Sequence, residues 1–403
     1  MTRSILLVGN HPPPYGGVPM HIRYLAPYLV ESGWDVHVLS FAGSPTRGAD
    51  VVEELEGYRV YRPAKWQKWR SALLRDVESL VANRSKSFAL QDPVEFLAAV
   101  GNAGLIRRIA ERNRVDLISA YHVMAGLPAA WVSEAFGIPL VTTIFGEVFA
   151  RPDFYRRRQR EVKYLCDVSK RLLSCSRHCA GSLRAIGLPH KVEAIYYGVD
   201  TGRFNPENDG LRIRLELGIA AEDSVVAFVG RMESELGLDI LFRAIPRVLQ
   251  VNKDARFIIA GRAGALTGGA IRLSQRLPRS VFVLTDIPPD DLPFFYAAAS
   301  LVVVPSVNAR ACLGLAIAEA MASGKPVIVA DSGGGREVIG DEGAGTVIPA
   351  AEPAALARAI TEMLGDPEGM RAAGEVGRRR AQKYFDKNTT NRTVEGVFRE
   401  VVR

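Results

Sequence analysis

The stretch LVVVPSVNARACLGLAIAEAMASGKPVIVADSGGGREV, residues 301–338, decides the fold. Two apolar runs rich in β-branched residues, 301–305 and 326–330, flank a segment of small, helix-forming residues. Such runs joined by a helix are typical of a parallel βαβ unit that is covered on both faces. In such sheets ligands bind beyond the carboxyl ends of the strands. The loop 307–313 and the glycines 333–335 are predicted to lie at that edge.

The same stretch offers groups for a phosphorylated ligand. A helix that begins at Gly314 would aim its free N–H groups at this edge, an arrangement that suits a phosphate. Glu319 lies one to two turns into that helix and would reach hydroxyls of the molecule that carries the phosphate. The stretch therefore predicts a binding site as well as a fold.

The whole chain alternates strands and helices. Its 403 residues are too many for one ordinary core and favour two domains. Turn formers gather at 198–210 (GVDTGRFNPENDG), which is the best candidate linker. We expect two doubly wound, Rossmann-like α/β domains that face a central cleft, with residues 1–200 and 201–380 as the domains and 381–403 as a terminal helix that packs back on the first.

Individual elements follow from the apolar pattern. Residues 63–101 are polar and helix-prone, and no fold is predicted for them. The predicted helices of the first half and of the end of the chain span 18–31, 103–113, 124–136, 178–186, 353–364 and 370–403. The predicted strands span 4–8, 35–40, 58–62, 115–120, 139–145, 171–175, 192–197, 224–230, 255–261, 281–285, 301–305, 326–330 and 346–348.

Composition narrows the class of protein. Apolar and charged fractions of 48% and 24% are those of a soluble globular protein. No run approaches the ~18 apolar residues of a membrane span, and residues 1–10 resemble a first strand more than a signal peptide. We therefore expect a cytoplasmic protein. The group Cys175, His178 and Cys179 can be interpreted as a metal site, but small core residues after a strand explain it better.

The excess positive charge lies in the first half. Residues 1–200 hold 26 Lys and Arg against 19 Asp and Glu, whereas the remainder holds 25 of each. Two basic segments stand out, 62–70 (RPAKWQKWR) and 151–163, the second with Arg156, Arg157, Arg158 and Arg160. Such segments suit peripheral contact with an anionic membrane, at the inner face of the membrane, or an anionic acceptor. A solvated helix face is the alternative, and nucleic acid is disfavoured because no recognition motif accompanies the charge.

Several loops carry candidate site residues. Gly16 and Gly17 join the first strand to a helix, and Gly230 with Arg231 holds the matching place in the second half, where an arginine suits a phosphate. Gly264 ends the next strand and would border a nucleotide base. Glu147 and His122 follow two strands of the first half. There is no Asp-x-Asp pair for a divalent metal, no phosphate loop of the Gly-x-x-x-x-Gly-Lys-Ser/Thr type, and no Gly-x-Gly-x-x-Gly fingerprint in the first turn.

Together these motifs resemble those of the retaining nucleotide-sugar glycosyltransferases of the GT-B fold, the group-one or family-four type. The resemblance runs over nearly the whole chain, through PPPYGGV, PLVTTIFG, IYYGVDTGRFNP, FVGR followed by GLD, IIAGRAG, DDLPFFYAAASLVVVPS and GLAIAEAMASGKPVIVADSGGGREVI. It implies transfer of a sugar from a nucleotide-diphosphate sugar, with retention of configuration, to a glycan, lipid-linked or other anionic acceptor. No metal and no cofactor is implied.

The resemblance also implies roles for residues. Arg231 would pair with the phosphates, the amides around Gly314 would receive the β-phosphate or the sugar, and Glu319 would bond the ribose hydroxyls. Stabilisation of charge on the departing phosphate would be the main catalytic effect. The residues predicted to bind the donor are Gly16, Gly17, Gly230, Arg231, Gly264, Arg310, Leu313, Gly314, Leu315 and Glu319. The residues predicted to be catalytic are Arg231, Glu319, Glu147 and His122.

Three positions depart from the family pattern. Leu236 stands where the family has a lysine, Ala311 where it has a glutamate, and Phe145 where a histidine is common. Glu147, His122 and Arg310 are candidates to compensate. The departures favour an alternative, a non-catalytic GT-B module that binds nucleotide sugar or serves as a partner subunit. Another enzyme class on the same fold, such as a sugar-nucleotide epimerase, is a third interpretation that no feature selects.

Overall fold

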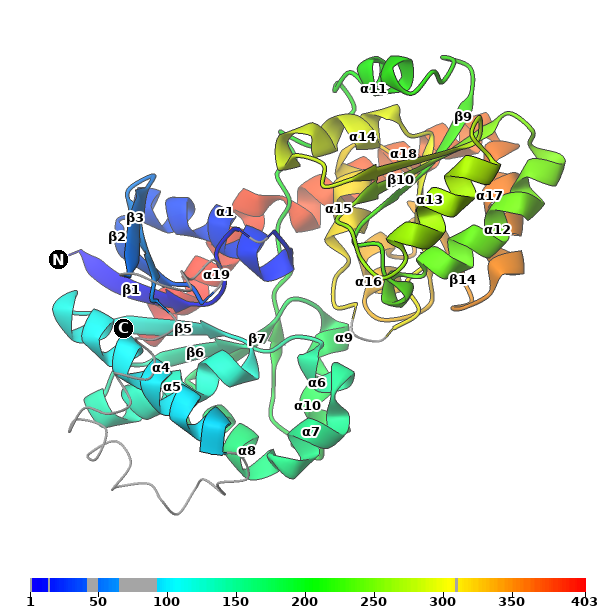
Figure 1. Ribbon diagram of the computed structural model, residues 1–403. Helices are drawn as coiled ribbons and strands as arrows, with labels where there is room; N and C mark the ends of the chain where they lie inside the picture. Colours follow the sequence, from blue (N-terminus) through cyan, green and yellow to red (C-terminus); the bar gives the residue numbers. More distant parts are fainter. Residues whose placement is uncertain (1, 14, 42–49, 65–92, 309–310) are drawn as a thin grey trace. The chain divides into compact units, whose positions relative to one another are not determined.

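The structure is a computed structural model that describes residues 2–13, 15–41, 50–64, 93–308 and 311–403 (Figure 1). The chain forms two compact units. The first comprises Met1–Tyr197 and Thr390–Arg403, and the second is Gly198–Thr389. Across the described residues no helix is long and apolar enough to cross a membrane.

The first unit is built on an eight-stranded sheet with the order β3-β4-β2-β1-β5-β6-β7-β8. All neighbours pair in parallel except β3, which runs antiparallel to β4 at one edge. The strands are β1 (Arg3–Val8), β2 (Trp34–Leu39), β3 (Val51–Leu55), β4 (Tyr58–Arg62), β5 (Leu117–Tyr121), β6 (Leu140–Thr143), β7 (Arg171–Ser174) and β8 (Glu193–Ala194). The strand β5 is buried along its whole length, as a central parallel strand must be when helices cover both faces.

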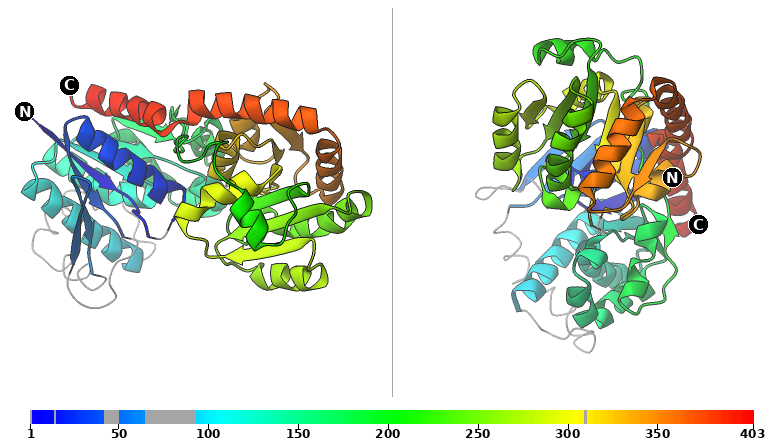
Figure 2. Two further views of the ribbon diagram at one scale, coloured as in Figure 1. Left: turned by 90° about the horizontal axis from the view of Figure 1, so that it is seen from above. Right: turned by 90° about the vertical axis from the view of Figure 1, so that its right-hand side faces the viewer.

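Helices cover both faces of this sheet. The core under α4, α5 and α8 is one apolar cluster, and α1 and α19 pack on the opposite face (Figures 1 and 2). In α1 the buried positions recur at helical spacing, with Ile22, Leu25 and Leu29 inward. The helices are α1 (Gly17–Glu31), α4 (Pro93–Arg112), α5 (Val123–Phe136), α6 (Glu147–Ala150), α7 (Pro152–Arg157), α8 (Gln159–Val168), α9 (Arg177–Ala180), α10 (Ser182–Ala185) and α19 (Lys387–Val401).

The second unit is built on a six-stranded parallel sheet with the order β11-β10-β9-β12-β13-β14. Its strands are β9 (Ser224–Val229), β10 (Ala255–Gly261), β11 (Val281–Thr285), β12 (Leu301–Val304), β13 (Val327–Ala330) and β14 (Gly345–Ile348). Its helices are α11 (Leu211–Glu216), α12 (Leu238–Val251), α13 (Thr267–Arg276), α14 (Leu292–Ala298), α15 (Leu315–Ala322), α16 (Gly335–Ile339), α17 (Pro353–Leu364) and α18 (Pro367–Arg380). A π-helical segment, Ala381–Phe385, follows α18. The two sheets confirm the predicted fold class of two doubly wound, Rossmann-like domains.

Several predicted elements were wrong in detail. The predicted helix 178–186 is two four-residue helices, α9 and α10, that meet at Gly181. The predicted strand 192–197 is a strand of two residues, and α4 begins ten residues before the predicted helix. The predicted helix 370–403 is interrupted by the π-helical segment. Short helices between residues 147 and 168 and the edge strand β3 were not predicted.

The segment 198–210 begins where the second unit begins, at the boundary that its turn formers predicted, and it packs within that unit. The amide of Val199 donates to the carbonyl oxygen of Phe385 at 2.7 Å. The Nζ of Lys387 lies 2.6 Å from an Asp200 carboxylate oxygen. The start of the predicted linker is therefore anchored to residues 385–387 of the same unit.

Candidate functional site

Arg231 lies at the carboxyl edge of the second sheet. It follows the end of β9 by two residues, and its side chain is exposed. Within the described part of the chain its guanidinium makes no hydrogen bond or ion pair. A cation that is exposed and unused at this edge is available to an anionic ligand.

The loops at this edge interlock through glycines. A Cβ on Gly261 would lie 2.0 Å from the carbonyl oxygen of Gly230, and one on Gly237 would lie 1.8 Å from the carbonyl oxygen of Pro305. Both glycines also have positive φ, 140° and 74°. The backbone at Gly230 therefore packs directly against Gly261, and no residue larger than glycine fits at position 261.

Gly314 is the N-cap of α15, with φ 70° in the left-handed region. Leu315 is the first residue of that helix, and Leu313 before it is buried. The first N–H groups of an α-helix have no partner inside the helix, so they face outward from this end. The sequence prediction of a helix that begins here matches the structure.

Glu319 is half-buried in the second turn of α15, and its Oε2 accepts a hydrogen bond from the Tyr296 hydroxyl at 2.7 Å. Burial raises the pKa of Glu319, while the Tyr296 hydroxyl and the nearby Arg203 act in the opposite direction. Tyr296 itself is fully buried and packs edge-on against Phe204. Tyr296 therefore fixes the orientation of the carboxylate. The sequence analysis did not identify this role of Tyr296, although a tyrosine among apolar helix residues indicates a buried hydroxyl that needs a hydrogen-bond partner.

Gly264 borders the same edge. Its amide donates to Thr267 Oγ1 at 2.8 Å, and the amide of Ala265 donates to Glu233 Oε1 at 3.3 Å. A carboxylate, Glu233, is therefore built into the loop where a nucleotide base was predicted. Arg310 lies outside the described residues.

The structure places the departures Leu236 and Ala311 in the second unit, Leu236 by its side chain and Ala311 by its backbone. Leu236 packs against the apolar cluster of the second unit. The carbonyl oxygen of Ala311 accepts the amide of Gly334 at 2.8 Å. A Cβ on Gly334 would lie 1.7 Å from the carbonyl oxygen of Cys312, so the glycine run 333–335 is what lets the two loops approach.

In the first unit, Gly16 and Gly17 form the entry to α1. Gly16 is the N-cap and Gly17 the first helical residue, and both are exposed. The amide of Met20 donates to the Gly16 carbonyl at 2.9 Å. The N–H groups of Gly17 and Val18 lie at the helix N-terminus, where such groups can bind an anion.

Arg62, which the sequence predicted as part of the basic segment 62–70 for an anionic membrane or acceptor, is instead buried and holds the loop before Gly16. Arg62 donates to the carbonyl oxygens of His11 at 3.2 Å and Pro12 at 2.6 Å, and its Nε lies 2.9 Å from Glu53 Oε1. His11 lies 3.0 Å from the Tyr58 hydroxyl, and burial lowers the pKa of His11 to about 4. The imidazole is therefore neutral at pH 7 and serves to hold the loop in place.

His122 and Glu147 are brought together at the carboxyl ends of β5 and β6. The Glu147 carboxylate accepts the amides of Val123 at 3.1 Å and Phe145 at 2.8 Å, and its Oε2 lies 3.7 Å from His122 Nδ1. His122 has φ 77°, rare for a residue with a side chain, and its side chain is 41% exposed. The geometry makes Glu147 a positioning residue and leaves the imidazole open to solvent.

Phe145 is buried under His122. Its ring lies 4.7 Å from the His122 ring and 5.5 Å from that of Tyr197, which in turn stacks on His21 at 3.7 Å. A side chain at position 145 therefore supports the neighbouring imidazole and does not reach solvent. Among the described residues no group of three or more His, Cys, Asp or Glu is placed to hold a metal.

The basic segment 151–163 is only partly available for ligands. Arg158 pairs with Glu95 and stacks 3.7 Å over the ring of Phe154. Arg156 pairs with Asp153, whereas Arg157 and Arg160 are exposed. Of the other segment, 62–70, residues 65–70 with both tryptophans lie outside the described residues.

Comparison with known proteins identifies the family. The profile "Glycosyltransferase Family 4" matches residues 15–203, and "Glycosyl transferases group 1" matches residues 211–380. A D-inositol 3-phosphate glycosyltransferase of Salinispora arenicola is 32% identical, over 73% of this chain and 71% of its own. The chain belongs to the group 1, family 4 glycosyltransferases. A second such protein, from Segniliparus rotundus, is 28% identical over 92% of this transferase and 81% of its own length.

Solved structures show the same fold. The sucrose-phosphate synthase of Thermosynechococcus elongatus superposes with a TM-score of 0.77 at 20% identity, over 99% of this transferase and 98% of that chain. The Anabaena protein HepE in complex with UDP gives a TM-score of 0.74 at 19% identity, over 98% and 100% of the two chains. The GT-B fold expected from the sequence is confirmed for the transferase.

Proposed function

We propose that the transferase moves a sugar from a nucleotide diphosphate to an anionic acceptor, with retention of configuration and without a metal. The observation that carries this proposal is Arg231, an exposed guanidinium at the carboxyl edge of the second sheet with no partner among the described residues. A diphosphate is the ligand that an arginine at such an edge recognises best.

The second unit supplies the donor half of the reaction. Negative charge develops on the diphosphate as it leaves, and fixed positive groups aimed at it lower the barrier. Arg231 and the N–H groups at the start of α15 provide those groups. Glu319, oriented by Tyr296, accepts hydrogen bonds from the ribose hydroxyls. Because these groups stabilise the negative charge of the diphosphate, the transfer needs no divalent cation.

The first unit supplies the acceptor half. The His122 imidazole, held near Glu147, contacts the acceptor hydroxyl, which attacks from the side of the leaving group. The relatives from Salinispora and Segniliparus carry the name D-inositol 3-phosphate glycosyltransferase. Together with the excess of basic residues in 1–200, this favours a phosphorylated polyol or sugar as acceptor.

Nucleotide binding tests the donor site directly. We expect one of UDP, GDP, ADP and dTDP to raise the melting temperature, because a ligand at 100 times its Kd adds about 2.7 kcal/mol, which corresponds to roughly 5–11 °C for a unit of this size. Arg231→Ala should abolish most of the shift. Arg247→Ala, which removes an exposed arginine in α12, is the matched control. Equal shifts in all three proteins would place the diphosphate elsewhere.

Turnover tests the rest of the proposal. With the nucleotide known, the matching nucleotide sugar is offered with D-inositol 3-phosphate and with unphosphorylated inositol. We expect a product only with the phosphorylated acceptor, the same anomeric configuration as the donor by NMR, and an unchanged rate in EDTA. An inverted product or loss of activity in EDTA contradicts the mechanism. Binding without any product would favour the non-catalytic alternative.

Peripheral contact with an anionic membrane is a separate part of the proposal. It is supported by Arg157 and Arg160, which are exposed on α7 and α8. Replacing both by Gln should reduce sedimentation with vesicles rich in anionic lipid at low salt, where screening is weakest. Arg156→Gln, which removes an arginine already paired with Asp153, should have a smaller effect. Equal sedimentation of all three proteins excludes this surface as the membrane contact.

A further inference from the structure

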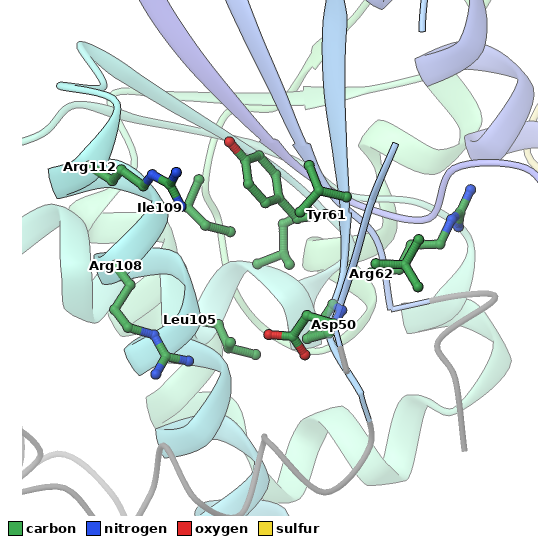
Figure 3. Close-up of a pocket in the computed structure, with 11 residues that line it drawn as sticks. Asp50, Tyr61, Arg62, Leu105, Arg108, Ile109 and Arg112 are labelled. Atoms are coloured by element: carbon green, nitrogen blue, oxygen red, sulfur yellow. The ribbon is translucent and has the colours of Figure 1, made fainter. Parts of the chain in front are cut away.

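Two cavities of the first unit differ in size and surroundings. The larger, of about 450 Å³, lies between α4 and the edge strands β3 and β4, and its lining includes Asp50, which directly follows the undescribed residues 42–49 (Figure 3). The smaller lies between α1, α19 and the strands β5, β6 and β7, and all the residues that line it fall within the described ranges. The chemistry of the smaller cavity is therefore set by side chains that the structure describes.

The smaller cavity lies in the core of the first unit. His21 lines it from α1, Tyr121 and Ser174 line it from β5 and β7, and Phe398 lines it from α19. Every residue of its lining is at most 7% exposed. The centre of a water molecule can lie anywhere within about 10 Å³ of it, which is room for one water and too little for a sugar, a nucleotide or a lipid.

Four polar groups at this cavity have no hydrogen-bond partner among the described residues. They are the Nδ1 of His21, the hydroxyls of Tyr121 and Tyr197, and the Oγ of Ser174. A buried polar group without a partner is destabilising, and native proteins contain few such groups. Four of them around one small cavity indicate a shared partner that is not part of the chain.

The lining favours a neutral partner that both donates and accepts hydrogen bonds. No Asp, Glu, Lys or Arg lines the cavity, and burial lowers the pKa of His21 to about 3, so its imidazole is neutral at pH 7. A buried ion would therefore find no opposite charge, which is costly. Hydroxyls can donate and a neutral imidazole nitrogen can accept, so the four groups suit water, which makes two to four hydrogen bonds in protein interiors.

We propose that this cavity is a binding site for one water molecule, which bridges the four polar groups. The hydroxyls of Tyr121 and Tyr197 donate to the water, and the water donates to Ser174 Oγ and His21 Nδ1. Each group then has a partner, and the water uses all four of its hydrogen bonds. The water is thus a structural component of the core of the first unit.

The same water positions His122 through a chain of aromatic rings. Tyr197 stacks on His21 with ring centres 3.7 Å apart, and Phe145 lies edge-on to Tyr197 at 5.5 Å. Phe145 in turn lies 4.7 Å from the His122 ring. A fixed Tyr197 hydroxyl therefore holds the ring on which Phe145 rests, which makes Tyr197 a positioning residue for His122. This second step rests on the proposed role of His122 at the acceptor.

A high-resolution crystal structure of the full chain tests the water directly. We expect one peak of electron density in the cavity, roughly 2.7–3.2 Å from at least three of the four polar groups. A cavity without density, or with density too large for a water, overturns the proposal.

Melting temperatures test the water in solution, because the sign of the change differs between a wet and a dry cavity. Tyr197→Phe and Ser174→Ala each remove a partner of the water and should lower the melting temperature. In a dry cavity the same changes would remove an unpartnered polar group and raise it. Tyr15→Phe, which removes the hydroxyl of a tyrosine that is 55% exposed, is the control and should change nothing. A rise in both cavity variants contradicts the water site.

Kinetics test the positioning of His122 separately. Tyr197→Phe should lower kcat several-fold and leave the KM of the nucleotide sugar unchanged, because a loosely held side chain orients the acceptor less well while the donor site lies in the second unit. An unchanged kcat overturns the positioning role of Tyr197. The crystal structure and the melting temperatures decide the water site even if no sugar transfer is found, so failure of the proposed function is not confused with failure of this inference.

Discussion

Tyr296 and Glu319 illustrate how a buried side chain orients a half-buried one. The carboxylate would be free to rotate without the 2.7 Å hydrogen bond from the Tyr296 hydroxyl. Desolvation acts against its charge, because burial raises the pKa of Glu319. The transferase therefore keeps a carboxylate in a place where it weakens the fold, which is common at sites that bind ligands.

This arrangement gives a pH dependence with a definite sign. An acid whose pKa is raised in the folded state reduces stability as the pH rises above its unfolded value, here 4.5. Glu319→Gln cannot ionise, so we expect it to be more stable than the natural protein at pH 8 and similar at pH 4. Urea unfolding at both pH values measures this difference. A variant that is less stable at both would show that the charge itself is favourable in the fold.

The placement of several candidate site residues could be predicted because they follow strands. Arg231 stands just past β9, and Gly314 and Glu319 belong to the loop and helix that follow β12; parallel sheets gather such positions at one edge. Tyr296, Arg62 and the burial of Phe145 could not be predicted in this way. Their roles arise from contacts across the fold, such as that between Arg62 and the carbonyl of Pro12, fifty positions apart.

At the scale of elements, the loops of the second sheet are held to one another by backbone. The Ala311 carbonyl accepts the amide of Gly334, and the amide of Val307 donates to the carbonyl oxygen of Glu235 at 3.1 Å. Three loops from different parts of the chain thus form one surface. The helix N-terminus of α15 is placed by this surface, since Gly314 follows the loop directly.

Gly334→Ala tests this interlocking. The added Cβ would meet the Cys312 carbonyl oxygen at 1.7 Å, so the loop before α15 must shift. We expect a destabilisation of about 1–3 kcal/mol and a loss of nucleotide affinity of at least about tenfold. Gly335→Ala is the matched control, because its nearest contacts would be 3.5 Å away. Equal affinities in the two variants would mean that the loop does not shape the donor site.

The elements themselves differed in how well the sequence predicted them. Central strands such as β9 and β12 are apolar runs, VVAFV and LVVV, which are typical of a sheet covered on both faces. The edge strand β3 reads VVEEL and is largely exposed, so it lacks that signal. Gly181, where α9 and α10 meet, also has no distinct pattern in the sequence.

At the scale of the whole molecule, the last helix completes the first unit. Phe398 is fully buried in that unit, Trp34 Nε1 donates to Glu395 at 3.2 Å, and Asn391 donates to the carbonyl oxygen of Tyr24 at 3.0 Å. These contacts join residues more than 360 positions apart. The first unit is thus made of two segments of chain, and the second is continuous.

Phe398→Ala tests whether the two units differ in stability. Removing this side chain should destabilise the first unit by about 3–5 kcal/mol through the cavity left behind. Hydrogen exchange should become faster in β5 and β6 and stay unchanged in β9 and β10. Arg403→Ala, which removes an exposed side chain of the same segment, is the control. Equal loss of protection in both sheets would show that the units unfold as one.

The division of the first unit into two segments has a consequence for synthesis of the protein. Residues 1–197 leave the ribosome first, but the helix that covers one face of their sheet is supplied by residues 390–403, after the whole of the second unit. At a synthesis rate of about 5–20 residues per second, that face of the sheet stays uncovered for roughly 10–40 s. The second unit has all of its chain available before the first does. During this interval the nascent chain presents the apolar surface around Tyr197 and Trp34, which makes it a natural client for chaperones.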